Sequence, residues 1–266
     1  MGVALPLSEG EFNDALRRVD EGTQKITDLT KSIIDACNRV GQWLGPLWDD
    51  VVDLLNRFVD LVQKLLSEIG KFLTRPGVPW TLWNHGTEWV KEVGKPVSDL
   101  ISQATTGQTD IDERWQGPAA TAYLGTLQDQ GKALAAIVAA TADIDDALTK
   151  VAGGIIAFWL GVLAAIVPYI IELAGWGAAA STVVGAPPAA AGAGASTLKV
   201  LGIVAAVLTA AVTYLTAVST QYKLLLRRVE TSEGFPAGHW PRSTNDIIAD
   251  GSLSGDKTTN WRLRTS

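Results

Sequence analysis

The side chains that could perform chemistry are few in this sequence, and they lie far apart. There are two histidines, His85 and His239, and one cysteine, Cys37. Two histidines cannot supply a multi-histidine metal centre, and one cysteine excludes both an intramolecular disulfide and a cysteine-based zinc site. The glycine beside His85 predicts that this histidine lies in a loop. Cys37 falls among apolar residues at helical spacing, which predicts a small buried hydrophobe rather than a nucleophile.

Carboxylates form two short clusters. They are Asp49, Asp50 and Asp53 in one, and Asp143, Asp145 and Asp146 in the other. Their spacing is typical of solvated helix faces and differs from that of a metal-binding loop. The sequence has no phosphate-binding glycine loop, nucleophile elbow or zinc-protease motif. We therefore expect no enzymatic activity, no catalytic residue, no cofactor, no metal and no small-molecule substrate.

Charge is distributed unevenly along the chain. Residues 1–150 hold 14 Lys and Arg against 22 Asp and Glu, a net charge of −8. An acidic half without a basic stripe cannot neutralise phosphates, so nucleic acid is not expected as a partner. The first residues have neither a basic region nor a long apolar one, so no cleaved secretory signal is expected.

Long helices must position whatever this chain presents to a partner. Ser8 and Glu11 have the spacing of a capping box, which predicts a helix start. Apolar residues then recur at alternating steps of four and three, the pattern of helices packed as in a coiled coil. We call this run the seam: Phe12, Leu16, Val19, Thr23, Ile26, Thr30, Ile33, Cys37, Val40, Leu44, Leu47, Val51, Leu54, Phe58, Leu61, Leu65 and Phe72. The dipeptide Gly45-Pro46 predicts a kink or break near Leu44.

Further helices are predicted after residues 74–79, which end the first run. Residues 80–107 have helical spacing that Gly94 and Pro96 interrupt, which predicts a shorter, irregular helix. A second long helix is expected from about Pro118 to about Lys150. Self-association, or contact with a partner protein, is expected through the seam helices.

Between Val151 and Tyr222 the sequence has only two charges, Glu172 and Lys199. The uncharged runs 151–171 and 200–222 have 21 and 23 residues, about 30 Å or more as helix, which matches the hydrocarbon core of a bilayer. Their aromatics are candidates for contact with the membrane interface. These aromatics are Trp159 and Tyr169 in the first run, Trp176 shortly after it, and Tyr214 and Tyr222 in the second. The small pairs Ala157/Gly161 and Ala206/Ala210 would let the two helices approach closely.

Two interpretations of this apolar hairpin are open. In one it enters or spans a membrane; in the other it is the buried helix pair of a soluble bundle. Pro168 and Glu172 favour the second, because a lone carboxylate is costly in lipid. Residues 177–197 are rich in Ala, Gly and Pro and are predicted to form a flexible connection.

Trp115 and Gly117 lie between the two predicted long helices. Trp115-Gln116-Gly117, followed by Ala120 and Tyr123, resembles the turn and second helix of the WxG family of type VII secretion substrates. That resemblance covers roughly residues 8–150 and implies a helical hairpin that dimerises or oligomerises and is exported by actinobacteria and their relatives without a cleaved signal. It also implies that Trp115 closes the end of the helix pair and that Gly117 permits the sharp turn.

The sequence differs from the family in two respects. About 70 residues separate Pro46 from Trp115, whereas the family's first helix lies close to its turn. The family's export signature, a Tyr followed four residues later by Asp or Glu, is missing after Tyr123, Tyr169, Tyr214 and Tyr222. A partner chain would then carry the export signal.

The sequence therefore predicts an all-α protein made of a long antiparallel helical hairpin or bundle, an apolar hairpin and an irregular tail. The expected domains are a WxG-like bundle at 8–150, an apolar hairpin at 151–222, and a helix end with a polar tail at 223–266. We expect a non-enzymatic, exported, oligomerising protein of a type VII pathway, secreted or in the cell envelope, that associates with membranes. The alternatives are a pore-forming toxin-like protein and a resident membrane scaffold.

Overall fold

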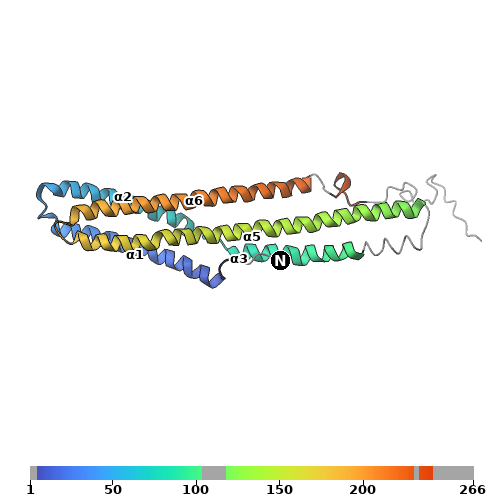
Figure 1. Ribbon diagram of the computed structural model, residues 1–266, viewed down its shortest axis with the longest axis horizontal. Coiled ribbons are helices and arrows are strands. Elements are labelled where there is room, and N and C mark those ends of the chain that lie inside the picture. The colour runs from blue at the N-terminus through green and yellow to red at the C-terminus, as the bar shows by residue number, and fades with distance from the viewer. Residues whose placement is uncertain (1–4, 104–117, 231–233, 242–266) are drawn as a thin grey trace, which may run out of the picture. The chain divides into compact units, whose positions relative to one another are not determined.

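The computed structural model describes residues 5–103, 118–230 and 234–241, and over these residues the chain is all-α, as its sequence predicts (Figure 1). The described residues contain no strand. The long helices are α1 (Glu9–Gly41), α2 (Trp48–Leu73), α3 (Pro79–Glu88), α5 (Pro118–Ala180) and α6 (Ala186–Glu230). The chain divides into two compact units. Of the described residues, 5–83 and 149–218 form the first unit, and 84–148 and those after 218 form the second. The divisions at 148/149 and 218/219 lie within four residues of the limits expected at 150 and 222, whereas the division at 83/84 was not expected.

The predicted capping box starts α1. The Ser8 amide donates to Oε2 of Glu11 at 2.8 Å, and the Glu11 amide donates to Oγ of Ser8 at 3.3 Å. Both bonds satisfy amides that a helix start leaves without partners. The donated hydrogen bonds lower the pKa of Glu11. The cap is therefore complete above the ordinary carboxyl range and is lost as the pH falls through the lowered pKa.

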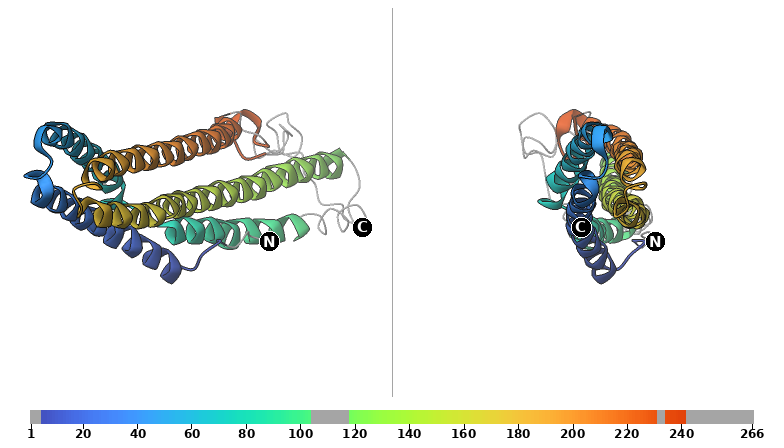
Figure 2. Two further views of the ribbon diagram at one scale, coloured as in Figure 1. Left: turned by 60° about the vertical axis from the view of Figure 1, so that its left-hand side comes forward. Right: turned by 90° about the vertical axis from the view of Figure 1, so that its left-hand side faces the viewer.

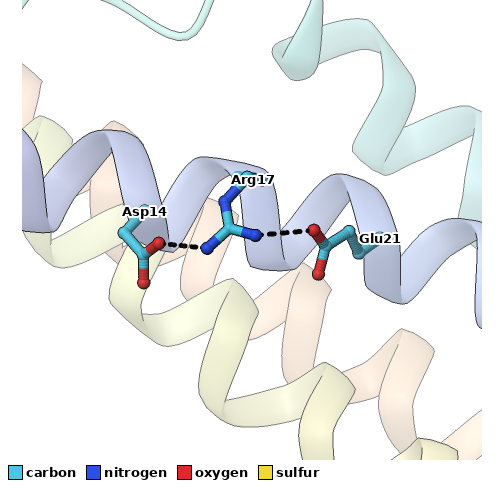
Figure 3. Close-up of polar contacts among 3 residues, drawn as sticks. All are labelled: Asp14, Arg17 and Glu21. Atoms are coloured by element: carbon cyan, nitrogen blue, oxygen red, sulfur yellow. Dashed lines mark hydrogen bonds and ion pairs between the residues drawn. The ribbon is translucent and has the colours of Figure 1, made fainter.

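The solvent side of α1 carries charged side chains in helical register. Figure 3 shows Arg17 between Asp14, three residues before it, and Glu21, four residues after it. The ion pair with Arg17 lowers the pKa of Asp14. All three side chains are more than half exposed, so this face of α1 points to water and the opposite face is left for packing.

The predicted break after α1 is a reversal of the chain. α1 ends at Gly41, a short 3₁₀ turn η1 (Gly45–Leu47) follows, and α2 returns alongside α1 (Figures 1 and 2). Gly45 has a φ of +54°, which glycine adopts without strain, and Pro46 takes the second position of the turn, where its missing amide costs no bond. Leu47 was expected on the seam, but it is exposed because it belongs to this turn.

One hydrophobic core joins α1, α2, residues 156–180 of α5 and residues 186–204 of α6. The seam supplies much of it. From α1 the buried seam residues are Phe12, Val19, Ile26, Thr30, Ile33 and Cys37, and from α2 they are Val51, Phe58 and Leu65. Gly22 lets α5 approach α1 closely, because a Cβ there would lie 2.8 Å from a methyl of Ile166. The seam therefore packs inside this chain.

The shorter, irregular helix predicted after α2 is present, and it continues through Gly94 and Pro96. Residues 79–103 are helical throughout, and the wide π turn η2 (Trp89–Gly94) ends two residues before Pro96. In a regular helix the proline ring would clash with the carbonyl four residues back, and a wider turn accommodates it. Gly94 is buried, and a Cβ there would lie 2.6 Å from Oγ1 of Thr141. Gly94 therefore serves close packing within the second unit and does not end the helix.

The connection between α5 and α6 is much shorter than predicted. Residues 177–180 still belong to α5 and residues 186–197 already belong to α6, so only residues 181–185 form the turn. Pro187 and Pro188 lie in the first turn of α6, where amides have no helical partner. The two prolines therefore do not prevent a helix. The hydroxyls of Ser181 and Thr182 donate to the carbonyls of Ala178 and Ala179, and the Gly185 amide donates to Thr182 Oγ1.

Two glycines of α6 give a matched test of this packing. A Cβ on Gly192 would lie 2.5–2.6 Å from the indole of Trp176, whereas a Cβ on Gly194 meets nothing within 4 Å. We expect Gly192→Ala to lower the free energy of unfolding by about 1–3 kcal/mol. Gly194→Ala is expected to raise it by about 0.5–1 kcal/mol, because alanine has the better helix propensity. Denaturant unfolding curves measure both, and shifts of the same sign would contradict the packing.

Candidate functional site

The residues considered first for chemistry do not gather into a site. Among the described residues, no group of three or more His, Cys, Asp or Glu side chains could hold a metal ion. His85 lies within α3 rather than in the predicted loop, because the neighbouring Gly86 is helical and packs against Asp145. Its Nδ1 lies 3.1 Å from Oε2 of Glu88, and both side chains are exposed. Asp49 and Asp50 are in the first turn of α2, where carboxylates complement the helix dipole.

Cys37 is buried in the core, as its place on the seam predicts. Burial raises the pKa of its thiol, so the thiolate is disfavoured near neutral pH. We expect the folded protein to react with an aromatic disulfide reagent at pH 8 at least 100-fold more slowly than the denatured chain. A cysteine introduced at the exposed position Ser67 serves as the control. Equal rates for the two thiols in the folded protein would contradict the burial of Cys37.

Three of the aromatics expected at the membrane interface lie inside the first unit or on its helix contacts. Trp159 is 1% exposed, and its Nε1 donates to the Pro76 carbonyl at 2.9 Å. The hydroxyls of Tyr169 and Thr197 share a hydrogen bond of 2.7 Å, which joins α5 to α6. Trp176 Nε1 donates to Ser196 Oγ at 3.1 Å between the same two helices. Their interfacial role in a membrane stays a prediction.

The remaining hairpin residues lie along the contact of α5 with α6 or on its surface. A Cβ on Gly161 would lie 3.1 Å from the methyls of Val207, so the glycine permits a close approach of the two helices there. Ala206 and Ala210 are exposed. Tyr214 is 38% exposed, and its hydroxyl donates to the Lys150 carbonyl at 2.8 Å.

The two charges of the hairpin neutralise each other. Nζ of Lys199 on α6 lies 3.0 Å from Oε1 of Glu172 on α5. Residues 151–222 contain no other Asp, Glu, Lys or Arg, so their net charge is zero. The lone carboxylate that counted against a membrane role is therefore paired, which removes much of its cost in lipid.

A large part of the hairpin's apolar surface is exposed. By length and composition, α5 and α6 are both long and apolar enough to cross a membrane. In α6 only 11% of the most apolar window of 18 residues is buried, against 39% in α5. The large exposed side chains form what we call the apolar surface: Leu160, Val167, Ile171, Val183, Val184, Leu198, Ile203, Val212, Tyr214 and Leu215. A soluble monomer seldom exposes so many large apolar side chains without using them.

Sequence reasoning identified the apolar hairpin but not which of its faces is covered. The sequence contained part of this information. The seam of α1 and α2 can cover one side of a helix pair, and the other side must then face outward. The WxG-like turn residues Trp115 and Gly117 lie outside the described residues. Comparison of the chain with protein-family models, curated proteins and solved structures found no match.

Proposed function

We propose that this chain is a non-enzymatic, membrane-associating helical protein whose α5–α6 hairpin is the part that meets the bilayer. The observation that carries the proposal is the exposure of α6, whose most apolar window is only 11% buried. The core helix of a soluble protein is buried on most sides, whereas this helix leaves its apolar residues uncovered. A bilayer covers such a surface at no cost in unpaired charge.

The polar groups inside the hairpin support its use as a unit. Tyr169 with Thr197, Trp176 with Ser196, and Glu172 with Lys199 each pair α5 with α6. Groups that bond to one another within the hairpin keep their partners if the hairpin leaves α1 and α2 for lipid. The hydrogen bond from Trp159 to the Pro76 carbonyl is different, because it joins α5 to the segment after α2 and must break on such a separation.

The experiment that tests the proposal is flotation of the purified full-length chain with lipid vesicles in a density gradient. We expect the chain to float with vesicles and to remain at the bottom without them. Recovery of all the protein at the bottom in both gradients would overturn the proposal. Alkaline carbonate treatment of the floated fraction then separates a hairpin held in the bilayer, which stays with the vesicles, from one held at the surface, which is released.

A pore-forming role is the second candidate, and the self-contained pairing of the hairpin favours it. A hairpin that can leave its soluble packing at the loss of the Trp159–Pro76 hydrogen bond is suited to insertion on a trigger. Release of an entrapped dye from vesicles between pH 5 and pH 8 measures it. A floating chain that releases no dye at any pH would leave a membrane scaffold and reject a pore.

We also propose export by a WxG-like route that needs no signal peptide. The resemblance at Trp115 and Gly117 is the sole support for this part of the proposal. Fractionation of cells with and without an intact type VII system tests it, and an unchanged distribution between cells and medium would reject it. Oligomerisation is proposed with it. Because the seam side chains pack within this chain, the apolar surface of α6 is the surface that a second copy or a partner would use.

A further inference from the structure

A cavity of about 760 Å³ lies within the first unit, between α5, α6 and the end of α2 with its following linker. Glycines shape the α5 side of it. Gly154 lets the ring of Tyr214 approach to 2.7 Å from where a Cβ would be, while Gly153 has nothing within 4 Å of that point. Gly77, with a φ of +83°, turns the linker so that it closes one side against Ile155. The volume lies in the range of pockets that hold one small molecule, and the exposed lining side chains Val212 and Leu215 leave the cavity open to solvent.

The interior of the cavity is apolar, and its aromatic side chains have their polar atoms engaged elsewhere. Phe72, Phe158, Val207 and Leu208 line it together with Trp159 and Tyr214. The indole Nε1 of Trp159 donates to the Pro76 carbonyl, and the Tyr214 hydroxyl donates to the Lys150 carbonyl. Tyr214 therefore offers the carbon surface of its ring to an occupant, Trp159 lies buried behind the wall, and neither polar atom needs a partner from the occupant.

One lining side chain is charged, and it is a cation. Arg75 lies in the linker after α2 and is exposed, and it has no ion-pair partner among the residues that the structure describes. A guanidinium is planar and can donate two parallel hydrogen bonds to a carboxylate. The cavity thus combines carbon walls with a single positive group, and the complementary occupant has a long apolar body and one anionic end.

We propose that this cavity binds one long acyl chain whose terminal carboxylate lies against Arg75, that is, a free fatty acid. The sequence predicted no small-molecule substrate, and the proposal adds a bound ligand without any reaction. Sequence patterns could not indicate the cavity, because residues 72–77, 153–161 and 207–215 come together only in the folded unit. The assignment does not rest on membrane association, since binding is measured in solution without vesicles.

The test is calorimetric titration of the full-length chain with oleate below its critical micelle concentration. We expect saturable binding of one oleate per chain. Ala210 lines the cavity, whereas Ala206, one turn earlier on α6, does not, and both are exposed. Ala210→Phe is expected to weaken oleate binding at least 10-fold, and Ala206→Phe to change it less than 2-fold. Absence of saturable binding, or equal effects of the two variants, would overturn the site.

The contact between the oleate carboxylate and Arg75 is tested separately with Arg75→Gln. Because this variant changes an exposed side chain, it remains a valid test if Ala210→Phe disturbs helix packing. We expect this variant to weaken oleate binding about 10-fold and to leave binding of oleyl alcohol unchanged. Arg57→Gln is the control, since Arg57 is an exposed arginine of α2 outside the lining. Equal oleate affinity in the Arg75 and Arg57 variants would overturn the assignment of the carboxylate to Arg75.

Discussion

Replacing Trp159 with alanine is expected to lower the free energy of unfolding by about 3–5 kcal/mol. Trp159 is the largest of the fully buried side chains and is 1% exposed. Its ring packs edge-on against Phe158, with centroids 5.1 Å apart. Truncation removes this packing and also leaves the Pro76 carbonyl without the indole donor that it has at 2.9 Å. Chemical denaturation followed by circular dichroism measures the loss.

Trp43 provides the matched control for this prediction, since it is 71% exposed in the turn after α1. Trp43→Ala should change the free energy of unfolding by less than about 0.5 kcal/mol. Trp159→Phe keeps an aromatic ring without the indole donor and should fall between the two. Unfolding midpoints that coincide for Trp43→Ala and Trp159→Ala would mean that Trp159 does not anchor the core.

The second large effect concerns membrane binding. Leu160 lies near the middle of the uncharged run 151–171, and its side chain is 38% exposed. Replacing a leucine with lysine at the centre of a membrane helix costs about 3 kcal/mol. We therefore expect Leu160→Lys to weaken binding to vesicles about 100-fold. Because the side chain is at the surface, the variant should keep the thermal stability of the parent in solution.

The control for Leu160→Lys is the same exchange at Leu100, which is exposed on the helix at 95–103, outside the apolar hairpin. Leu100→Lys should bind vesicles as the parent does. Titration of both variants with vesicles, followed by sedimentation, gives the two affinities. If both exchanges weakened binding alike, net charge rather than the apolar surface would govern association.

Local signals in the sequence predicted local structure well. The capping box at Ser8 and Glu11 and the break at Gly45-Pro46 depend on neighbouring residues alone, and both are present. Seven-residue spacing predicted the burial of Phe12, Val19 and Ile26. On α2 part of the buried face lies one residue later than the seam predicts. Leu55 and Val62 are buried, whereas the seam residue Leu54 is only partly buried. A shift of one residue turns a helix by about 100°, and the partner that fixes this rotation is distant in sequence.

Composition misled the prediction at the connection of α5 and α6. Gly, Ala and Pro in residues 177–197 were interpreted as a flexible segment, yet alanine is the best helix former and proline is accommodated in a first turn. At Gly192 the absence of a Cβ lets the indole of Trp176, which lies 16 residues earlier, pack closely against the helix. Packing between α5 and α6 therefore adds to local helix preferences that composition alone had hidden.

The candidate site could be predicted only in part for the same reason. The apolar runs and the two opposite charges are visible in the sequence, but the pairing of Glu172 with Lys199 depends on how α5 and α6 align. The burial of Trp159 and Tyr169 depends on α1 and α2 covering one side of the helix pair. Mean hydropathy is averaged over all sides of a helix, so it indicates an apolar helix without indicating which side packs against a neighbour.

The five-residue turn at 181–185 has a consequence for sidedness. Its hydroxyls bond to the chain's own carbonyls, and Val184 at its tip is 88% exposed. A hairpin with an apolar tip would cross a bilayer tip first and so return its second helix to the side from which the first one came. A protease added to the face from which the hairpin entered would then cleave the chain at labelled Trp43 and at its start. A labelled Val184, on the opposite face of the vesicle, would be protected.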